Sequence, residues 1–249
     1  MSKQRTHEWT GLDDRLKHYH LSQYQNPKRS TVAFEAFVCP QLQGTGKVLD
    51  LGGGSGSATA FLAERHPEVE FVCGEYVDEL ITLGREIART ENRDNLSFRQ
   101  LDWFDLPPLT EFDGVMSLQT LSWLPECAGP LTQIFEKVAP RWIALTSLFY
   151  EGDISARTEV CENRRDGGAG RRAFYNTYAL PEISRLCQQH GYRLSRVEDF
   201  EIDIDLEKPA DPDFMATYTE QLARDGSRIQ ISGPVLMNWK TLLIEKQPA

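Results

Sequence analysis

Short apolar runs alternate with helically spaced segments through the middle of the chain. Runs suited to buried strands lie at 47–53, 70–76, 95–103, 112–121 and 141–150. Segments with apolar residues at helical spacing lie between them, at 57–67, 78–90 and 128–140. Because parallel strands need helical crossovers, this alternation predicts an α/β fold built on a doubly wound, mostly parallel sheet.

The segments on either side of this region have a different character. Residues 8–38 show helical spacing with a break near Pro27, which predicts two helices before the first strand. Residues 161–178 are polar and rich in glycine, and we expect an inserted loop there. Residues 180–192 are expected to form a helix that glycine ends.

Near the C-terminal end, residues 195–209 alternate with period two. The apolar positions are Phe200, Ile202, Ile204 and Leu206, and the intervening acids are Glu201, Asp203, Asp205 and Glu207. This pattern predicts an edge strand whose acidic face is solvated, in preference to a cation site, because charge on an edge discourages stray pairing. Residues 235–246 are expected to form the last strand.

Composition narrows the class of protein. The 249 residues carry a formal net charge of -10, and such a chain is a poor general binder of nucleic acid. No window approaches the roughly 18 apolar residues of a membrane helix, and the polar first twenty residues do not resemble a secretory signal. The five cysteines form no CxxC or Cys/His cluster, so we expect free thiols in the cytoplasm and no metal site.

A glycine-rich stretch, VLDLGGGSGSAT, follows the first predicted strand. A P-loop is excluded because it requires a lysine that is absent here. A dinucleotide fingerprint is weakened because Ser57 stands where the third glycine belongs, although Glu75 lies at the distance of its acidic residue. The pattern D-x-G-x-G-x-G matches at every position, namely at Asp50, Gly52, Gly54 and Gly56.

These residues resemble the class I S-adenosylmethionine (SAM)-dependent methyltransferases. The resemblance implies a seven-stranded sheet with an antiparallel last strand, an N-terminal helical lid over 1–45 and one SAM-binding domain over 1–249. It also implies a set of cofactor-binding residues at the strand ends. They are Asp50, Gly52, Gly53, Gly54 and Gly56 at the amino acid end, Glu75 at the ribose, Tyr76, Asp102 and Trp103 at the adenine, Ser117 and Gln119 at the methionine side, and Tyr24 and Arg29 closing over SAM.

Methyl transfer from a sulfonium needs a positioned nucleophile, and a base is optional. Candidate bases are Glu151, Asp153, His18 and His20. The acceptor atom is expected to be O or N. Methylation of a nucleobase amino group is disfavoured, because SLQTLSW stands where the amino-methylases of this family carry their motif. No metal is expected. Cys127 is interpreted as a small buried apolar residue rather than a methyl carrier.

The inserted segment 151–178 is the candidate substrate loop. Its chemistry-bearing residues are Arg164, Arg165, Arg171, Arg172, Tyr175, Asn176 and Tyr178. Arginine pairs bind carboxylate or phosphate, so a lid that recruits a small anionic, sugar-bearing or phosphate-bearing acceptor and a solvated charged loop both explain the sequence. Two other functions stay open: an NAD(P)-dependent oxidoreductase, and a SAM-binding scaffold without catalysis. The oligomeric state is open as well.

Overall fold

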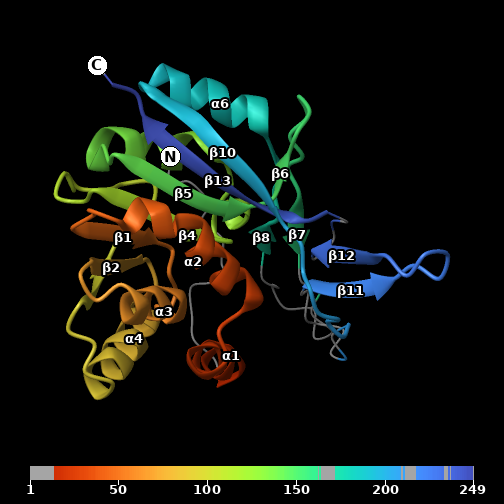
Figure 1. Ribbon diagram of the computed structural model, residues 1–249, viewed down its shortest axis with the longest axis horizontal. Helices are drawn as coiled ribbons and strands as arrows, with labels where there is room; N and C mark the ends of the chain where they lie inside the picture. Colours follow the sequence, from red (N-terminus) through yellow and green to blue (C-terminus); the bar gives the residue numbers. More distant parts are fainter. Residues whose placement is uncertain are drawn as a thin grey trace.

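The computed structural model describes residues 14–161, 163, 172–208, 210, 217–232, 235 and 237–248. Its centre is a seven-stranded sheet of order β10-β13-β5-β4-β1-β2-β3 (Figure 1). The strands are β1 (Lys47–Leu51), β2 (Glu70–Glu75), β3 (Leu96–Gln100), β4 (Gly114–Leu118), β5 (Trp142–Ser147), β10 (Tyr192–Phe200) and β13 (Trp239–Lys246). β13 runs antiparallel to both of its neighbours, and β1 to β5 are mutually parallel. The predicted fold class is confirmed.

Helices cover both faces of the sheet, which explains why the central strands read as continuous apolar runs. Val48 packs into one core and its neighbour Leu49 into the other, and both are fully buried. The helices are α1 (Asp14–Gln25), α2 (Arg29–Leu42), α3 (Ser57–Arg65), α4 (Asp78–Thr90), α5 (Ala128–Gln133) and α6 (Leu180–Gln189). Residues of α2, α3 and α4 fill one core, and residues of α5 and α6 fill the other.

The helix expected at 128–140 is not continuous. α5 gives way to a π-helical turn over Ile134–Val138, and Ala139 ends it in the left-handed region at φ 51°. A second short element, the 3-10 turn Leu121–Trp123, follows β4. Such irregular turns are commonly found beside functional sites.

The strand expected over 195–209 is too long. β10 ends at Phe200, which pairs with Trp239, the first residue of β13. Leu206 instead exchanges hydrogen bonds with Thr219 of a separate hairpin, β11 (Thr217–Gln221) and β12 (Arg228–Ser232), which was not predicted. β10 is an edge strand as expected, and the exposed Asp205 forms an ion pair with Arg228 at 2.8 Å.

The insertion after β5 contains short strands on both sides of its undescribed residues. β6 (Phe149–Tyr150) pairs with β9 (Tyr178–Ala179), and β7 (Glu159–Cys161) pairs with β8 (Arg172–Phe174). The β11–β12 hairpin projects from one side of the molecule in Figure 1.

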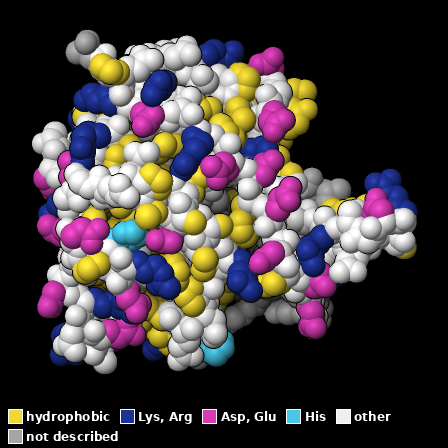
Figure 2. Space-filling view, viewed as in Figure 1, with side chains coloured by type: hydrophobic (Ala, Val, Ile, Leu, Met, Phe, Trp, Pro, Cys, Tyr) yellow, Lys and Arg dark blue, Asp and Glu magenta, His cyan; other side chains and the backbone are white. Residues whose placement is uncertain are grey.

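Among the residues whose structure is described, no helix is both long and apolar enough to cross a bilayer. The face seen in Figure 2 has Lys and Arg side chains interspersed with Asp and Glu side chains. The net negative charge is therefore not gathered into one patch on that face.

Candidate active site

The glycine-rich stretch forms the turn between β1 and α3. Gly52, Gly54 and Gly56 have φ values of 70°, 61° and 83°, in the left-handed region that favours glycine. The N–H of Gly52 donates to the carbonyl oxygen of Gly74 at 2.7 Å, which anchors the turn to β2. The alternating glycines are therefore required by the backbone path itself.

Close packing requires glycine at two of these positions independently of φ. A Cβ on Gly52 would lie 2.5 Å from Cγ2 of Thr120, and one on Gly56 would lie 2.6 Å from the ring of Phe98. A Cβ on Gly54 would meet His20 at 3.0 Å. The turn thus packs closely against Thr120 after β4, Phe98 on β3 and His20 on α1.

Glu75 at the end of β2 holds a carboxylate directly beside this turn. Its Oε2 accepts a hydrogen bond from the N–H of Gly54 at 2.9 Å, and its Oε1 accepts from the N–H groups of Tyr76 at 2.7 Å and Val77 at 3.0 Å. Burial raises the pKa of Glu75, and the three backbone donors oppose that shift. The carboxylate is therefore fixed in orientation before any ligand binds.

Asp50 is buried on β1 below the turn. Its Oδ2 accepts a hydrogen bond from Oγ1 of Thr59 at 2.6 Å, whereas its Oδ1 has no hydrogen-bond partner among the described residues. Burial raises the pKa of Asp50 to about 7, and the nearby Glu75 adds to the shift. Asp50 thus offers an unused buried acceptor beneath the glycine turn.

The raised pKa of Asp50 makes a prediction about stability. Between the ordinary carboxyl pKa near 4 and the folded value of about 7, the folded protein keeps a proton that the unfolded chain releases. The free energy of unfolding therefore falls as pH rises through this window. Asp50→Asn removes the effect, so we expect the variant to gain about 1–3 kcal/mol over the wild type between pH 4.5 and 7.5.

Urea unfolding of both proteins across this pH range measures the difference. The Asp94→Asn variant is the control, because it removes a carboxyl group that is exposed at the surface. An Asp50→Asn difference that stays constant with pH would contradict the assignment.

Helix α1 covers the glycine turn. The hydroxyl of Tyr24 donates to the carbonyl oxygen of Ser55, and Nδ1 of His20 lies 3.3 Å from Oγ of the same serine. His20 is buried, its Nε2 has no partner among the described residues, and burial together with the charge of Lys28 lowers its pKa to about 4. His20 is therefore a neutral imidazole near pH 7, over the turn.

The other candidates from the N-terminal segment lie at the surface. His18 is exposed. The half-exposed guanidinium of Arg29 reaches Asp203 at 3.7 Å, beyond the end of β10. Tyr24 and His20, rather than Arg29, are thus the residues that α1 brings to the glycine turn.

The predicted positions after β3 and β4 lie at the same edge of the sheet. Oδ1 of Asp102 accepts from the N–H of Phe104 at 3.0 Å. Trp103 is buried in the core, and its Nε1 has no hydrogen-bond partner in the part of the chain that the structure describes. Oγ of Ser117 donates to the carbonyl oxygen of Leu51 at 2.7 Å, which ties β4 to β1. Gln119 leaves β4 with φ 59°. The C-terminal ends of β1, β2, β3 and β4 therefore lie along one edge of the sheet.

A pocket of about 230 Å³ lies beyond the end of β5, and Phe149, Tyr150, Glu151, Asp199, Met237, Asn238 and Lys240 line it. The ammonium of Lys240 contacts Oε1 of Glu151 at 3.1 Å and also pairs with Asp199. Lys240 is 8 % exposed, whereas the side chain of Glu151 is 75 % exposed. Asp153 is exposed nearby in the chain. Sequence reasoning missed Lys240, and a lysine within the apolar run of the last strand was the available signal.

Most of the predicted substrate-loop residues that the structure describes have internal partners. Asn176 is fully buried: its Oδ1 accepts from the N–H of Thr158 at 2.9 Å, and its Nδ2 donates to the carbonyl oxygen of Leu124 at 2.8 Å. Tyr178 is also fully buried, and its hydroxyl donates to the same carbonyl at 3.2 Å. Both side chains therefore have internal hydrogen-bond partners that hold the loop, and their contact with substrate stays a prediction.

Of the remaining predicted loop residues, the structure describes Tyr175 and Arg172. Tyr175 is buried against Trp123, with 4.8 Å between ring centroids. Arg172 is exposed and pairs with Glu159 at 2.7 Å. The predicted Arg164, Arg165 and Arg171 lie outside the described residues.

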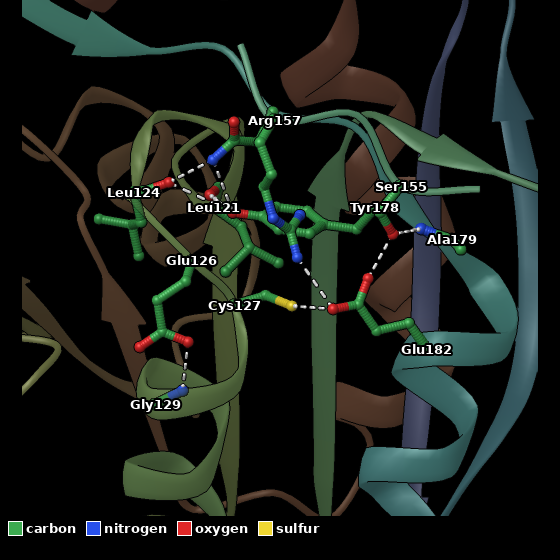
Figure 3. Close-up of polar contacts among 11 residues, drawn as sticks. Leu121, Leu124, Glu126, Cys127, Gly129, Ser155, Arg157, Tyr178, Ala179 and Glu182 are labelled. Atoms are coloured by element: carbon green, nitrogen blue, oxygen red, sulfur yellow. Dashed lines mark hydrogen bonds and ion pairs between the residues drawn. The ribbon is translucent and has the colours of Figure 1, made fainter. Parts of the chain in front are cut away.

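Glu182 at the start of α6 contacts three residues that hold the insertion and the segment after β4 together, as Figure 3 shows. Its Oε1 accepts from Nη2 of Arg157 at 2.9 Å and lies 3.7 Å from Sγ of Cys127, and its Oε2 accepts from Ser155. The Arg157 guanidinium lies over the ring of Tyr178 at 4.4 Å. Burial raises the pKa of Cys127 to about 12, so this residue is a protonated thiol near neutral pH.

Comparison with known proteins identifies the family. A family model described as a methyltransferase domain matches residues 42–189, which is more than half of the chain. The chain belongs to this methyltransferase family. The match begins before the glycine turn and ends with α6, so it includes all four strand ends described above.

One curated relative and two solved structures are similar to this chain. Over 81 residues it is 40% identical to a protein-L-isoaspartate O-methyltransferase of Myxococcus xanthus (strain DK1622), a match to 31% of the chain and only 36% of that relative. Magnesium protoporphyrin IX methyltransferase of Synechocystis PCC 6803, solved with S-adenosylhomocysteine, has a TM-score of 0.57 at 13% identity, with 95% and 89% of the two chains covered.

A third relative has the same fold. The 1,6-didemethyltoxoflavin-N1-methyltransferase of Burkholderia thailandensis gives a TM-score of 0.57 at 13% identity, covering 94% of this chain and 88% of its own. These identities show a shared fold rather than a shared substrate. The chain has the class I methyltransferase fold, and the Synechocystis relative was solved with SAM as well as with S-adenosylhomocysteine.

The residues at the glycine turn fit SAM on chemical grounds. SAM carries an ammonium group and two ribose hydroxyls that donate hydrogen bonds, and a carboxylate that accepts them. The unpartnered Oδ1 of Asp50 and the fixed carboxylate of Glu75 are acceptors at this place, and the backbone of the turn supplies donors.

Proposed function

We propose that this methyltransferase transfers the methyl group of SAM to an oxygen or nitrogen atom of a small molecule. The observation that carries the proposal is the fixed carboxylate of Glu75 beside three left-handed glycines, with a polar pocket beyond the end of β5 at the same edge. Ligands bind at this edge of open α/β sheets.

The residues at the strand ends would bind and orient the cofactor. In this proposal the glycine turn holds the amino acid end, Glu75 accepts from the ribose hydroxyls and Asp102 accepts from the adenine amino group. α1 closes the site from above through Tyr24 and His20, and so excludes water from the amino acid end. SAM supplies a methyl group that its sulfonium makes electrophilic.

The acceptor would enter the pocket lined by Glu151 and Lys240. A carboxylate there can take the proton that a hydroxyl or ammonium acceptor loses, and Glu151 is the better placed candidate because it lines the pocket. The lysine between two carboxylates leaves this pocket with a net negative charge, so it does not by itself select an anion. Binding of an anionic, sugar-bearing or phosphate-bearing acceptor would depend on the arginines of the 151–178 insertion.

Binding and turnover measurements test the proposal. Thermal shift with SAM, S-adenosylhomocysteine and NAD should show stabilisation by the first two, equivalent to about 2.7 kcal/mol at a ligand concentration of 100 Kd. A panel of small hydroxyl and amine acceptors, read by mass increase, then identifies turnover. Stabilisation by NAD without SAM would overturn the proposal, and SAM binding without turnover across the panel would favour a scaffold.

Once an acceptor is identified, the Glu151→Gln variant tests whether Glu151 acts as the general base. We expect kcat to fall about a hundredfold, because general base catalysis typically contributes at least that much, while the Kd for SAM stays unchanged. The exposed Asp153→Asn is the matched control and should retain most of kcat. Equal rates for the two variants would remove Glu151 from the mechanism.

A further inference from the structure

We propose that Glu35, Cys39 and His66 form a zinc site between α2 and the end of α3. The carboxylate oxygen of Glu35, Sγ of Cys39 and a ring nitrogen of His66 all lie within 4.8 Å of one another. His66 ends α3 just before β2 begins, so the cluster lies at the sheet edge opposite the glycine turn. The proposal is therefore independent of the catalytic site.

The local structure explains how the three side chains meet. Glu35 and Cys39 are four residues apart on α2, which places them on one face of that helix. His66 follows the last turn of α3, and its backbone N–H donates to the carbonyl oxygen of Leu62 at 3.0 Å. The His66 ring is buried, and Glu35 and Cys39 are partly buried. The sequence conceals the cluster because its members come from two elements.

The ligand atoms are close to the spacing that zinc needs. Ligands at about 2.0–2.3 Å from a tetrahedral zinc ion lie about 3.3–3.8 Å apart. Nε2 of His66 is 2.9 Å from Oε1 of Glu35, and the widest ligand pair is no more than 4.8 Å apart. In the proposed site, the short distance lengthens and the long one shortens when the side chains turn toward the ion.

A second carboxylate lies on the other side of the imidazole. Oε1 of Glu68 is 3.8 Å from Nδ1 of His66, an ion-pair distance that is longer than a hydrogen bond. In metal sites, a carboxylate that comes within hydrogen-bond distance of this nitrogen fixes the orientation of the histidine and increases its basicity. Ion pairs of His66 with Glu35 and Glu68 explain the contacts at both ring nitrogens, but they give no role to Cys39, whose Sγ belongs to the same cluster.

The donor set indicates zinc rather than calcium or magnesium. Those harder cations take oxygen ligands, whereas zinc combines thiolate, imidazole and carboxylate in tetrahedral sites. A water molecule would complete the four ligands. The Cys39 thiol releases its proton to solvent when the bond to zinc forms, and the two anionic ligands balance the charge of the ion.

Metal titration of the chelator-treated full-length protein tests this site. We expect one equivalent of ZnCl2 to bind by calorimetry and to raise Tm, and CoCl2 to give the absorption of a tetrahedral thiolate complex. Cys39→Ser and His66→Gln should each weaken zinc binding at least a hundredfold. Glu68→Gln should weaken it by about tenfold.

Cys161→Ser is the matched control, because Cys161 is an exposed cysteine outside the cluster. It should bind zinc as the wild type does. SAM binding, measured on every variant, reports that the protein is folded and is expected to be unchanged. Absence of stoichiometric zinc binding, or binding that Cys39→Ser leaves intact, would overturn the proposal and leave the contact as an ion pair.

Discussion

Replacing Glu75 with alanine is expected to weaken SAM binding by at least a hundredfold. The buried carboxylate accepts hydrogen bonds from the N–H groups of Gly54, Tyr76 and Val77. Hydrogen bonds to a charged group contribute about 1.5–3 kcal/mol each, and a buried donor left unpaired adds a further cost. The variant loses both the carboxylate that holds the glycine turn and the proposed acceptor for the ribose hydroxyls. A hundredfold increase in Kd corresponds to a loss of about 3 kcal/mol of binding free energy.

Calorimetric titration with SAM measures this effect directly. Glu86→Ala removes an exposed glutamate from the same region, on α4, and should leave the Kd unchanged. Glu75→Gln is informative as well, because its amide can accept from only one side while its NH2 faces a backbone donor. Wild-type affinity in Glu75→Ala would show that the carboxylate organises the loop without binding the cofactor.

Asn176→Ala should lower the free energy of unfolding by about 2–4 kcal/mol. The fully buried amide accepts from the N–H of Thr158 and donates to the carbonyl oxygen of Leu124, and it also lies 3.3 Å from the hydroxyl of Tyr178. Alanine leaves the Thr158 donor unpaired inside the protein and opens a small cavity. Urea unfolding measures the loss, and the Kd for SAM is expected to change little.

The exposed Gln188→Ala on α6 provides the reference for loss of an amide at the surface. Its stability should lie within about 0.5 kcal/mol of the wild type. If Asn176 contacted substrate instead of bracing the loop, its variant would be as stable as this control, and only the KM for the acceptor would rise.

Much of the sheet could be predicted from the sequence because burial on both faces leaves little freedom in the pattern. Val48, Leu49 and Leu51 read as one apolar run because neighbouring residues enter different cores. The helix predicted over 78–90 is the observed α4, since its acids and apolar positions separate cleanly. The alternation of strands and helices could therefore be predicted from local sequence patterns.

The errors came from contacts between distant segments. The period-two pattern continues past Phe200, but the ladder that the structure describes between β10 and β13 ends there, where Phe200 pairs with Trp239. Lys240 joins Glu151 and Asp199 only because β5, β10 and β13 are neighbours in the sheet. The internal partners of Asn176 could not be predicted, because the sequence of a loop does not show which distant groups a buried amide will contact.

The placement of β13 has a consequence for the order in which the protein folds. β10 is made before β13, yet β13 is the one strand that pairs with it among the residues that the structure describes. β13 also pairs with the free edge of β5. A growing chain that stops before Trp239 therefore has an open edge on β5 and an unpaired β10. Such edges invite pairing with other chains, so nascent chains of this length are expected to be most vulnerable to aggregation until the last strand is inserted.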